Sequence, residues 1–296
     1  MYNPVMRKSL ANTWASLQAD DTKSLKNLLD YIQISRGTDF SRYRQATIRR
    51  MLDRRMQDTG QETVGAYFDY LQRNPEEIQH LLRSLTVKVS SFFRNPLSFE
   101  IIQAMVIPDL VQNFGAVTAW SIGCANGEEP YSLAIILREL IQKERMSFTC
   151  RIIASDMDAN ALKKAKRAEY TGDTLDDVKK KQLDAYFEPV SRSAGYEHTC
   201  TFRLKKEITD MVCFSCGDME ALLRNEASGR FNLILCRNVL IYMNLALQHE
   251  LLDSICGILY PKGYLMLGES ETLPSVLQPK FLQPFPGVKI YQKKSF

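Results

Sequence analysis

Carboxylates and glycines gather in the stretch WSIGCANGEEPYSLAIIL, Trp120 to Leu137, in a spacing that suits the binding of a small charged ligand. An apolar run leads into Gly123, and a second run with helical spacing follows Gly127, which predicts a strand, a tight turn and a helix. Glycine lets the backbone approach a ligand closely, and Glu128 and Glu129 could hold ribose hydroxyls or a cationic group. A phosphate is disfavoured, because the spacing is G-x-x-x-G and a pyrophosphate prefers bare amides. The alternative is an ordinary turn without a ligand.

A second acidic position follows in RIIASDMDANALKKA, residues 151–165. This stretch predicts a short buried strand that ends at Asp156 and Asp158, before a helix that begins near Asn160. An acidic residue at the end of the strand after a glycine turn is where a nucleoside-binding α/β fold holds ribose hydroxyls. We therefore assign the ligand role to Asp156, and we expect Asp158 to cap the helix.

A third polar cluster follows the apolar run of RFNLILCRNVLIYMN, residues 230–244. The predicted strand ends at Cys236, and Asn238 and Tyr242 come shortly after it. Residues just beyond the carboxyl ends of strands line the ligand crevice of an open α/β sheet. We expect Asn238 and Tyr242 to face the same crevice as Gly123 and Asp156.

A candidate cationic residue, Arg94, lies in LTVKVSSFFRNPLSFE, residues 85–100. The Phe92 and Phe93 pair should anchor this segment in apolar surface, and Pro96 prevents a simple continuation of a preceding helix. Arg94 would then point away from the anchor as a site residue. The alternative is a surface arginine that follows an aromatic anchor.

The elements that carry these residues belong to a chain of 296 residues, which is long enough for two ordinary domains. Hydrophobic residues make up 45% and charged residues 24%, which excludes a disordered chain. The sequence has no apolar run near the ~18 residues that span a bilayer and no signal-peptide pattern, so we expect a cytoplasmic protein without membrane insertion. Its seven scattered cysteines favour reduced thiols over a disulfide framework.

Residues 1 to about 88 predict an all-helical domain, and its most informative part is RYRQATIRRMLDRRM, residues 42–56. On a helix, Ile48, Met51, Leu52 and Met56 share one arc. The adjoining arc is cationic, so it predicts either a docking surface for an acidic partner or a solvated face. The net charge of +4 is mild and no nucleic-acid-binding motif is present, so we expect no nucleic-acid partner. The residues of the cationic arc are Arg42, Arg49, Arg50 and Arg54.

An excursion from Pro189 to Val212 interrupts the predicted sheet domain. The turn residue Gly195 and the alternation in TCTFRLK predict a small antiparallel hairpin inserted into that domain. Cys213 and Cys216 have the C-x-x-C spacing of a zinc site, but a continuous strand would send them to opposite faces, so we expect no metal. The remaining sheet elements are a helix at 245–259, a strand at 264–267 and a closing hairpin from 280–282 and 288–292.

The sequence resembles the CheR-type chemotaxis receptor methyltransferases. The resemblance rests on an arginine-rich helical N-terminal region followed, in this order, by SSFFRNP, WSIGCANGEEPYS, ASDMD, CRNVLIYMN and LGESE. It covers the chain from about Asp39 to the C-terminus. It implies a Rossmann-like class I methyltransferase domain of α/β fold with an inserted small antiparallel β-subdomain, preceded by an all-helical N-terminal domain.

The resemblance also implies a cofactor, a reaction and a partner. The cofactor would be S-adenosylmethionine, with S-adenosylhomocysteine as the product. The substrate would be glutamate side chains on the cytoplasmic helical bundle of chemoreceptors, which would become methyl esters. The alternatives are a methyltransferase for another signalling protein and a degenerate member that binds a nucleoside or partner without catalysis. We expect a monomer, with a receptor-docking domain at 1–88, a linker with the FFR motif at 89–108, and a catalytic domain at 109–296 with the β-subdomain at about 189–212.

The resemblance assigns roles to individual residues. Tyr242 would lie beside the reacting methyl group, and Arg94 would touch the cofactor. From the chemistry, Arg94 could also hold the substrate carboxylate, so both are the expected catalytic residues. The sequence departs from the family pattern at several positions, and the departures Lys88 and Asp218 place charges where the family has neutral side chains. These two side chains could compensate each other by pairing. The implied cofactor residues are Lys88, Ser90, Arg94, Gly123, Glu129, Asp156, Asp218, Met219, Asn238 and Val239.

Overall fold

A computed structural model describes residues 19–36, 39–85, 90–143, 146–191, 200–217 and 231–295. The chain divides into two compact units, Met1–Val87 and Lys88–Phe296. Each unit is described below by itself.

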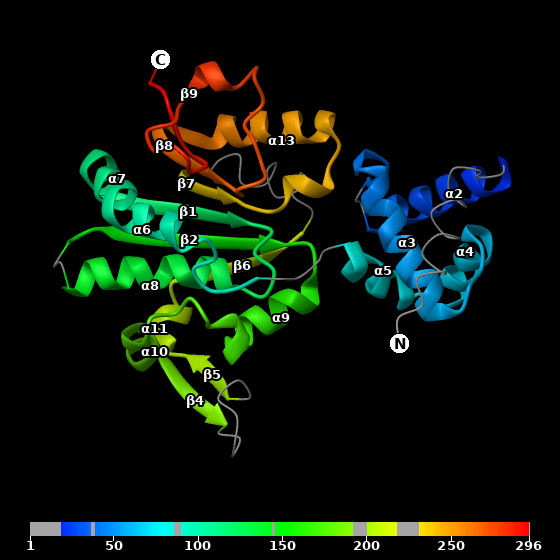
Figure 1. Cartoon of the computed structure of the whole chain (residues 1–296), viewed down its shortest axis with the longest axis horizontal. Helices are drawn as coiled ribbons and strands as arrows, with labels where there is room; N and C mark the ends of the chain where they lie inside the picture. Colours follow the sequence, from blue (N-terminus) through cyan, green and yellow to red (C-terminus); the bar gives the residue numbers. More distant parts are fainter. Residues whose placement is uncertain are drawn as a thin grey trace. The chain divides into compact units, whose positions relative to one another are not determined.

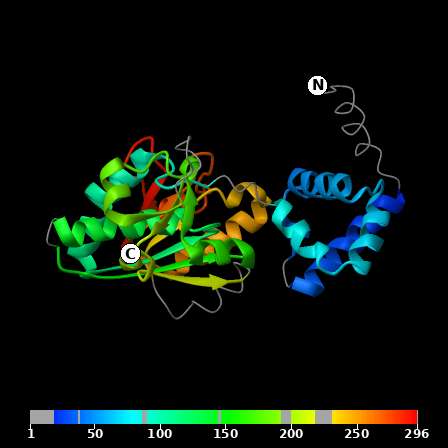
Figure 2. The same ribbon diagram turned by 90° about the horizontal axis from the view of Figure 1, so that it is seen from below.

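All regular elements in the described part of the first unit are helices, drawn in blue to cyan in Figures 1 and 2. Helix α3 (Gln45–Thr59) is followed by Gly60, which adopts a left-handed conformation with φ of 68°, as glycine often does just after a helix. Thr63 caps the next helix by accepting a hydrogen bond from the amide of Ala66. The helices are α2 (Ala19–Arg36), η2 (Phe40–Arg42), α3 (Gln45–Thr59), α4 (Val64–Arg73) and α5 (Glu77–Leu85).

A buried ion pair ties three of these helices together. Glu77 is 4% exposed, and its carboxylate accepts hydrogen bonds from Arg55 Nε at 2.7 Å and Arg55 Nη2 at 3.0 Å. The hydroxyl of Tyr67 donates to the same carboxylate at 2.9 Å. Burial raises the pKa of Tyr67, and the negative charge of Glu77 raises it further. Arg55 is therefore a structural arginine of the helical unit.

The second unit is built on a seven-stranded sheet within its described residues, in the order β6-β2-β1-β7-β8-β10-β9. The first five strands in this order pair in parallel, and β10 pairs antiparallel with both β8 and β9. The predicted Rossmann-like sheet and its closing hairpin are confirmed. The strands are β1 (Ala116–Ile122), β2 (Thr149–Asp156), β6 (Val212–Cys216), β7 (Phe231–Cys236), β8 (Leu259–Leu267), β9 (Phe281–Leu282) and β10 (Ile290–Lys293).

Helices cover both faces of this sheet. Figure 1 shows α8 (Glu128–Lys143) and α13 (Leu245–Ile258) on opposite faces. The strands between them carry almost continuous apolar residues, as expected for a parallel sheet buried on both sides; β7, for example, is buried along its whole length. The other helices are α6 (Pro96–Ile101), the π-helical turn η3 (Ile102–Val106), α7 (Ile107–Phe114), α9 (Ala159–Arg167), α10 (Lys180–Tyr186) and α11 (Lys206–Thr209).

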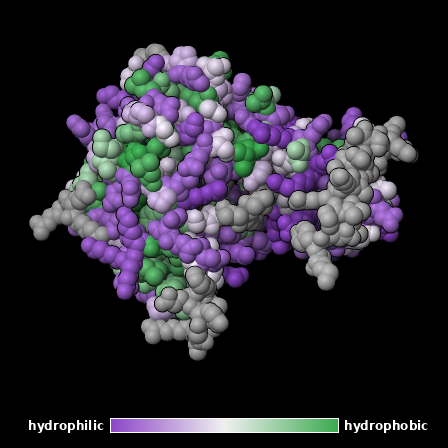
Figure 3. All heavy atoms as spheres, in the orientation of Figure 1, coloured by the Kyte–Doolittle hydropathy of each residue, from purple (hydrophilic) through white to green (hydrophobic). Residues whose placement is uncertain are grey.

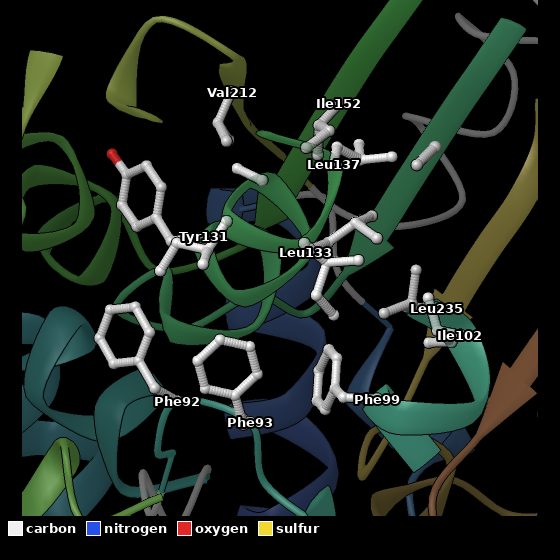
Figure 4. Packing of buried hydrophobic residues seen from close by; sticks show 14 of the residues in the cluster. Phe92, Phe93, Phe99, Ile102, Tyr131, Leu133, Leu137, Ile152, Val212 and Leu235 are labelled. Atoms are coloured by element: carbon white, nitrogen blue, oxygen red, sulfur yellow. The ribbon is translucent and has the colours of Figure 1, made fainter. Parts of the chain in front are cut away.

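The segment expected to be a linker, residues 89–108, packs into the core of the second unit from Phe92 onward. Phe92 and Phe99 are 0% and 2% exposed. Figure 4 shows Phe92, Phe93 and Phe99 beside Tyr131 and Leu133 of α8. The aromatic residues of this segment bury enough apolar area to make it part of the fold.

A second, three-stranded antiparallel sheet is inserted into the unit, in the order β3-β5-β4. Its strands are β3 (Glu169–Thr171), β4 (Phe187–Ser191) and β5 (Thr201–Leu204), and β4 and β5 lie beside α10 and α11 in Figure 1. The insertion predicted from Pro189 to Val212 starts too late, because β3 at Glu169 already pairs with β5. It also extends one residue too far, because Val212 belongs to β6 of the large sheet. A strand as short as β3 has too few residues for alternation to reveal it.

The molecular face in Figure 3 is mostly hydrophilic, with hydrophobic areas that are small and separate. Exposed large apolar side chains among the described residues include Leu97, Met105, Leu245 and Val276. None of the described helices has the length and hydrophobicity needed to cross a bilayer.

Candidate functional site

The candidate site lies where three neighbouring parallel strands end. β1 pairs with β2 on one side and with β7 on the other. The chain continues from β1 to β2 and β6, and then returns to the other side of β1 as β7. In open α/β sheets, ligands bind beyond the carboxyl ends of the strands where the strand order reverses in this way. Gly123, Asp156 and Asn238 lie at these three strand ends, and their common role in ligand binding stays a prediction.

The glycine turn needs glycine for its backbone and for close packing. Gly123 has φ of +69°, and a Cβ there would lie 2.6 Å from Val239 Cγ2. Gly127 has φ of +94°, and its Cβ would lie 3.0 Å from the Cβ of Ala165. A side chain at either position would therefore strain the backbone and push the neighbouring element away. The turn is held against α9 and against the loop that carries Val239.

Asp156 braces this turn. Its Oδ2 accepts a hydrogen bond from the amide of Ala125 at 2.8 Å, and its Oδ1 accepts one from the amide of Asp158 at 2.8 Å. An ionised carboxylate only accepts hydrogen bonds, which suits it to bind hydroxyl groups. Asp158 caps α9 by accepting from the amide of Asn160 at 2.8 Å. The predicted capping role of Asp158 is confirmed, and the ligand role of Asp156 stays a prediction.

The two adjacent glutamates at the start of α8 have different surroundings. Glu129 accepts from the Ser121 hydroxyl at 2.7 Å and forms an ion pair of 3.2 Å with Arg237 Nη1. Glu128 is 1% exposed, and its Oε2 is buried without a hydrogen-bond partner. Burial raises the pKa of Glu128, and hydrogen bonds from Ser90 and Asn126 partly offset the effect.

Glu128 and Glu129 were both candidates from the glycine turn, but the family resemblance assigned the cofactor role to Glu129 alone. We selected Glu129 by family resemblance, yet both oxygens of Glu129 already have protein partners. A buried carboxylate oxygen without a partner is costly unless a ligand completes it. The sequence shows two adjacent acids, and which of them faces the crevice depends on how α8 packs on the sheet.

Arg237 binds the backbone around Arg94, residues 93–95, which we call the Arg94 segment. The guanidinium Nη2 donates to the Arg94 carbonyl at 2.8 Å and to Asn95 Oδ1 at 2.6 Å. Arg237 is 6% exposed, and its guanidinium carbon lies 5.4 Å from the centre of the Phe99 ring. This buried cation links Glu129 of α8 to the backbone of Arg94, whose side chain is half-buried. The sequence did not predict this linking position of Arg237.

The Arg94 segment also adopts an uncommon backbone. Phe93 has φ of 52° and Asn95 has φ of 62°, values in the left-handed region that non-glycine residues seldom adopt. The amide of Phe93 donates to the Ser132 hydroxyl at 2.9 Å, which ties the segment to α8. Surrounding contacts must hold such a conformation, and it frequently occurs at functional sites.

The inserted sheet contacts the glycine turn through Tyr170 of β3. Its hydroxyl donates to the Asn126 carbonyl at 2.7 Å. The ring of Tyr170 lies 4.8 Å from the ring of Phe92 in an edge-on arrangement. Tyr170 thus joins the small sheet, the glycine turn and the Phe92 anchor.

Three predicted cofactor residues, Lys88, Asp218 and Met219, lie outside the described residues. The side chain of Ser90 is hydrogen-bonded to Glu128. Asn238, Val239 and Tyr242 are half-buried at the end of β7 and in the turn η6 (Leu240–Tyr242) that follows. The cofactor roles of these residues stay predictions.

The four arginines predicted to dock a partner belong to the first unit. Ile48, Met51 and Leu52 are buried, as predicted, and Arg50 and Arg54 are exposed on α3. Arg42 belongs to η2, because α3 begins only at Gln45 after the non-helical Arg44. The continuous helix assumed from the sequence is therefore wrong at its first residues.

The cysteines form no cluster of metal ligands in the described part of the chain, where no group of three or more His, Cys, Asp or Glu side chains could hold an ion. Cys213 and Cys216 are exposed on β6. Burial raises the pKa of Cys124 and of Cys236. Their thiols are therefore protonated at neutral pH, and both residues act as small core side chains.

Comparison with known proteins gives a consistent family assignment. Residues 88–284 match the family "CheR methyltransferase, SAM binding domain", and residues 23–86 match "CheR methyltransferase, all-alpha domain". The chain is 29% identical over 251 residues to a chemotaxis protein methyltransferase of Listeria innocua, covering 82% of this chain and 90% of that protein. It is 30% identical over 229 residues to the chemotaxis protein methyltransferase of Salmonella typhimurium, covering 77% and 76%. Among solved structures, it is similar to the N-methyltransferase NodS of Bradyrhizobium japonicum WM9, with a TM-score of 0.37, 13% identity and coverage of 71% and 91%.

Proposed function

The chain belongs to the CheR methyltransferase family, and from this premise we propose that it methylates glutamate side chains on the cytoplasmic helical bundle of chemoreceptors. It is an S-adenosylmethionine-dependent methyltransferase with a Rossmann-like class I methyltransferase domain and an all-helical N-terminal domain. The relatives named above are chemotaxis protein methyltransferases. The glutamate ester, the receptor bundle and the roles of individual residues are our proposal.

The donor groups of the crevice fit the cofactor. S-adenosylmethionine carries ribose hydroxyls, an ammonium group and a sulfonium, and it supplies an electrophilic methyl group when bound. Asp156 lies at the end of β2 beside the glycine turn, and a carboxylate is the acceptor that ribose hydroxyls need. The buried, unpartnered oxygen of Glu128 suits an ammonium group, because a cation would stabilise the ionised carboxylate. The unpartnered Oε2 of Glu128 is the main observation that supports placing the cofactor at this site.

The proposed reaction requires positioning rather than proton transfer. A glutamate carboxylate has an ordinary pKa of about 4.3, so it is ionised at neutral pH and needs no general base. Its attacking oxygen must lie about 3 Å from the methyl carbon and in line with the bond that breaks. The Arg94 guanidinium can hold the substrate carboxylate through a charge-assisted pair. Tyr242, half-buried in η6, can orient the same carboxylate through its hydroxyl.

Arg237 prepares Arg94 for this role. It holds the Arg94 carbonyl and Asn95, and it also pairs with Glu129 of α8. The backbone that bears Arg94 is thereby fixed to the helix that follows the glycine turn. A guanidinium held on such a backbone loses less conformational freedom when it binds a carboxylate.

The substrate proposal is tested by transfer of a labelled methyl group to receptor cytoplasmic fragments. We expect incorporation into the helical fragment, and none after its candidate glutamates are replaced by alanine. A receptor fragment that stays unlabelled, while a different signalling protein is labelled, would contradict the receptor assignment and keep the methyltransferase assignment. Calorimetric titration with S-adenosylmethionine and S-adenosylhomocysteine tests cofactor binding separately. A bound ligand should also raise the temperature of thermal unfolding, which gives a second measure of binding.

A further inference from the structure

We infer that Glu271 is a positioning residue that holds the Asn238-Val239 loop in the conformation required for cofactor binding. Glu271 is 4% exposed. Its Oε1 accepts hydrogen bonds from the amides of Val239 and Leu240, each at 2.8 Å. Its Oε2 accepts from the amide of Asn238 at 2.9 Å and from the amide of Gly268 at 2.7 Å. One carboxylate thus binds four backbone amides, and three of them are consecutive.

The loop that Glu271 binds cannot hold its shape through secondary structure. Asn238 has φ of 59°, a left-handed conformation that non-glycine residues seldom adopt, although asparagine tolerates it better than most. The three amides follow the end of β7 and precede or begin the short turn η6. Without an acceptor they would lack partners at a half-buried position. The four charge-assisted hydrogen bonds that Glu271 accepts stabilise this backbone conformation and give the amides their partners.

The same loop lines the crevice from the β7 side. Val239 packs so close to Gly123 that a Cβ on this glycine would approach Val239 Cγ2 to 2.6 Å. Tyr242 lies on η6, whose first amide, that of Leu240, is bound by Glu271. A change in the Glu271 carboxylate is therefore transmitted to Asn238, Val239 and Tyr242 together.

Gly268 is required by this arrangement. A Cβ at Gly268 would lie 2.8 Å from Glu271 Oε2, 2.9 Å from the amide nitrogen of Asn238 and 3.0 Å from Asn238 Nδ2. Two of these three atoms belong to Asn238, so an alanine would displace the loop even with the carboxylate present. Glycine at 268 and glutamate at 271 therefore act together, and Gly268→Ala offers a second way to disturb the loop.

Glutamine cannot replace Glu271, although it has nearly the same shape. Its amide has one oxygen and an NH₂ group that only donates. Whichever way the amide turns, the NH₂ would face amide donors, so about half of the four hydrogen bonds would be lost. Aligned donors would also repel each other in a buried site.

The inference rests on the proposed cofactor crevice, and the test is designed to separate the two. S-adenosylhomocysteine affinity is measured by calorimetry for the wild type, Glu271→Gln and Gly268→Ala, at a temperature where circular dichroism shows each protein folded. Amide hydrogen exchange is measured in the same proteins without ligand. Glu139→Gln is the matched control, because Glu139 is a buried glutamate of the same unit, 7% exposed, that accepts from Gln182 at 3.2 Å.

We expect both loop variants to bind at least tenfold more weakly than the wild type. Exchange at the amides of Asn238, Val239 and Leu240 should accelerate, while β7 stays protected. The control should bind as the wild type does, even if its stability falls. If Glu271→Gln does not fold, Gly268→Ala decides the matter, since it keeps the carboxylate.

Faster exchange with wild-type affinity would overturn the inference and leave Glu271 a purely structural residue. Unchanged exchange at the three amides would overturn it as well. Absence of binding by the wild type would instead contradict the proposed cofactor crevice.

Discussion

Glu128→Gln should make the ligand-free protein more stable and its cofactor binding weaker. Glu128 is 1% exposed, its Oε2 has no hydrogen-bond partner, and burial raises its pKa. A buried group without a partner costs about 1–3 kcal/mol, and more when it is charged. Glutamine removes the charge but keeps a buried polar group, so we expect a gain of about 1–2 kcal/mol in the free energy of unfolding at neutral pH.

The gain should depend on pH in a defined direction. The folded protein holds the Glu128 proton more tightly than the unfolded chain, whose carboxyl has the ordinary value of 4.5. The wild type therefore loses stability as the pH rises from this value through the raised folded-state pKa. The glutamine variant lacks that loss, so the difference between the two proteins should be small at the acid end and complete above the raised pKa.

Cofactor affinity should change in the opposite direction. A hydrogen bond to a charged group contributes about 1.5–3 kcal/mol, so loss of the pair with the ammonium group corresponds to roughly ten- to a hundredfold weaker binding. Urea unfolding without ligand and calorimetric titration with S-adenosylhomocysteine measure the two effects. Glu139→Gln, on the same helix, should leave the affinity unchanged. A Glu128→Gln variant that is less stable than the wild type and binds equally well would refute the reasoning.

Two further variants test the catalytic and docking residues. Arg94→Ala should lower turnover on the order of a hundredfold, as the loss of a positioning contact does. Arg94→Lys should restore little of it, because an ammonium lacks the planar two-pronged geometry of a guanidinium. Near-normal turnover of the alanine variant at saturating cofactor and receptor would show that Arg94 is only a surface residue. Replacement of the exposed Arg50 and Arg54 by glutamate should weaken methylation at subsaturating receptor and low salt while cofactor affinity stays constant, because like charges would face an acidic bundle. An unchanged rate under those conditions would identify this face as merely solvated.

The sheet and its crevice could be predicted because local patterns decide them. Apolar runs that end in Gly123, Asp156 and the polar pair after Cys236 are typical of buried parallel strands with their ligand residues at one edge. The capping role of Asp158 follows from its position alone. These features depend on residues that are close together in the sequence.

The missed features depend on contacts between distant segments. Glu271 binds amides more than thirty residues away along the chain, and Arg237 reaches the Arg94 carbonyl across a much larger separation. No spacing rule connects such positions. The orphaned oxygen of Glu128 arises from the packing of α8 against its surroundings, and β3 of the inserted sheet is too short to show alternation. Tertiary packing therefore accounts for most of what the sequence did not reveal.

The most direct test of the central claim is the chemical nature of the transferred methyl group. The protein would be incubated with labelled S-adenosylmethionine and a receptor cytoplasmic fragment, and the labelled fragment would then be treated with mild base. We predict that the label is released as volatile methanol, because a glutamate methyl ester hydrolyses under these conditions. A label that enters the fragment but resists base would show transfer to nitrogen or another stable position and would contradict the proposed glutamate O-methylation.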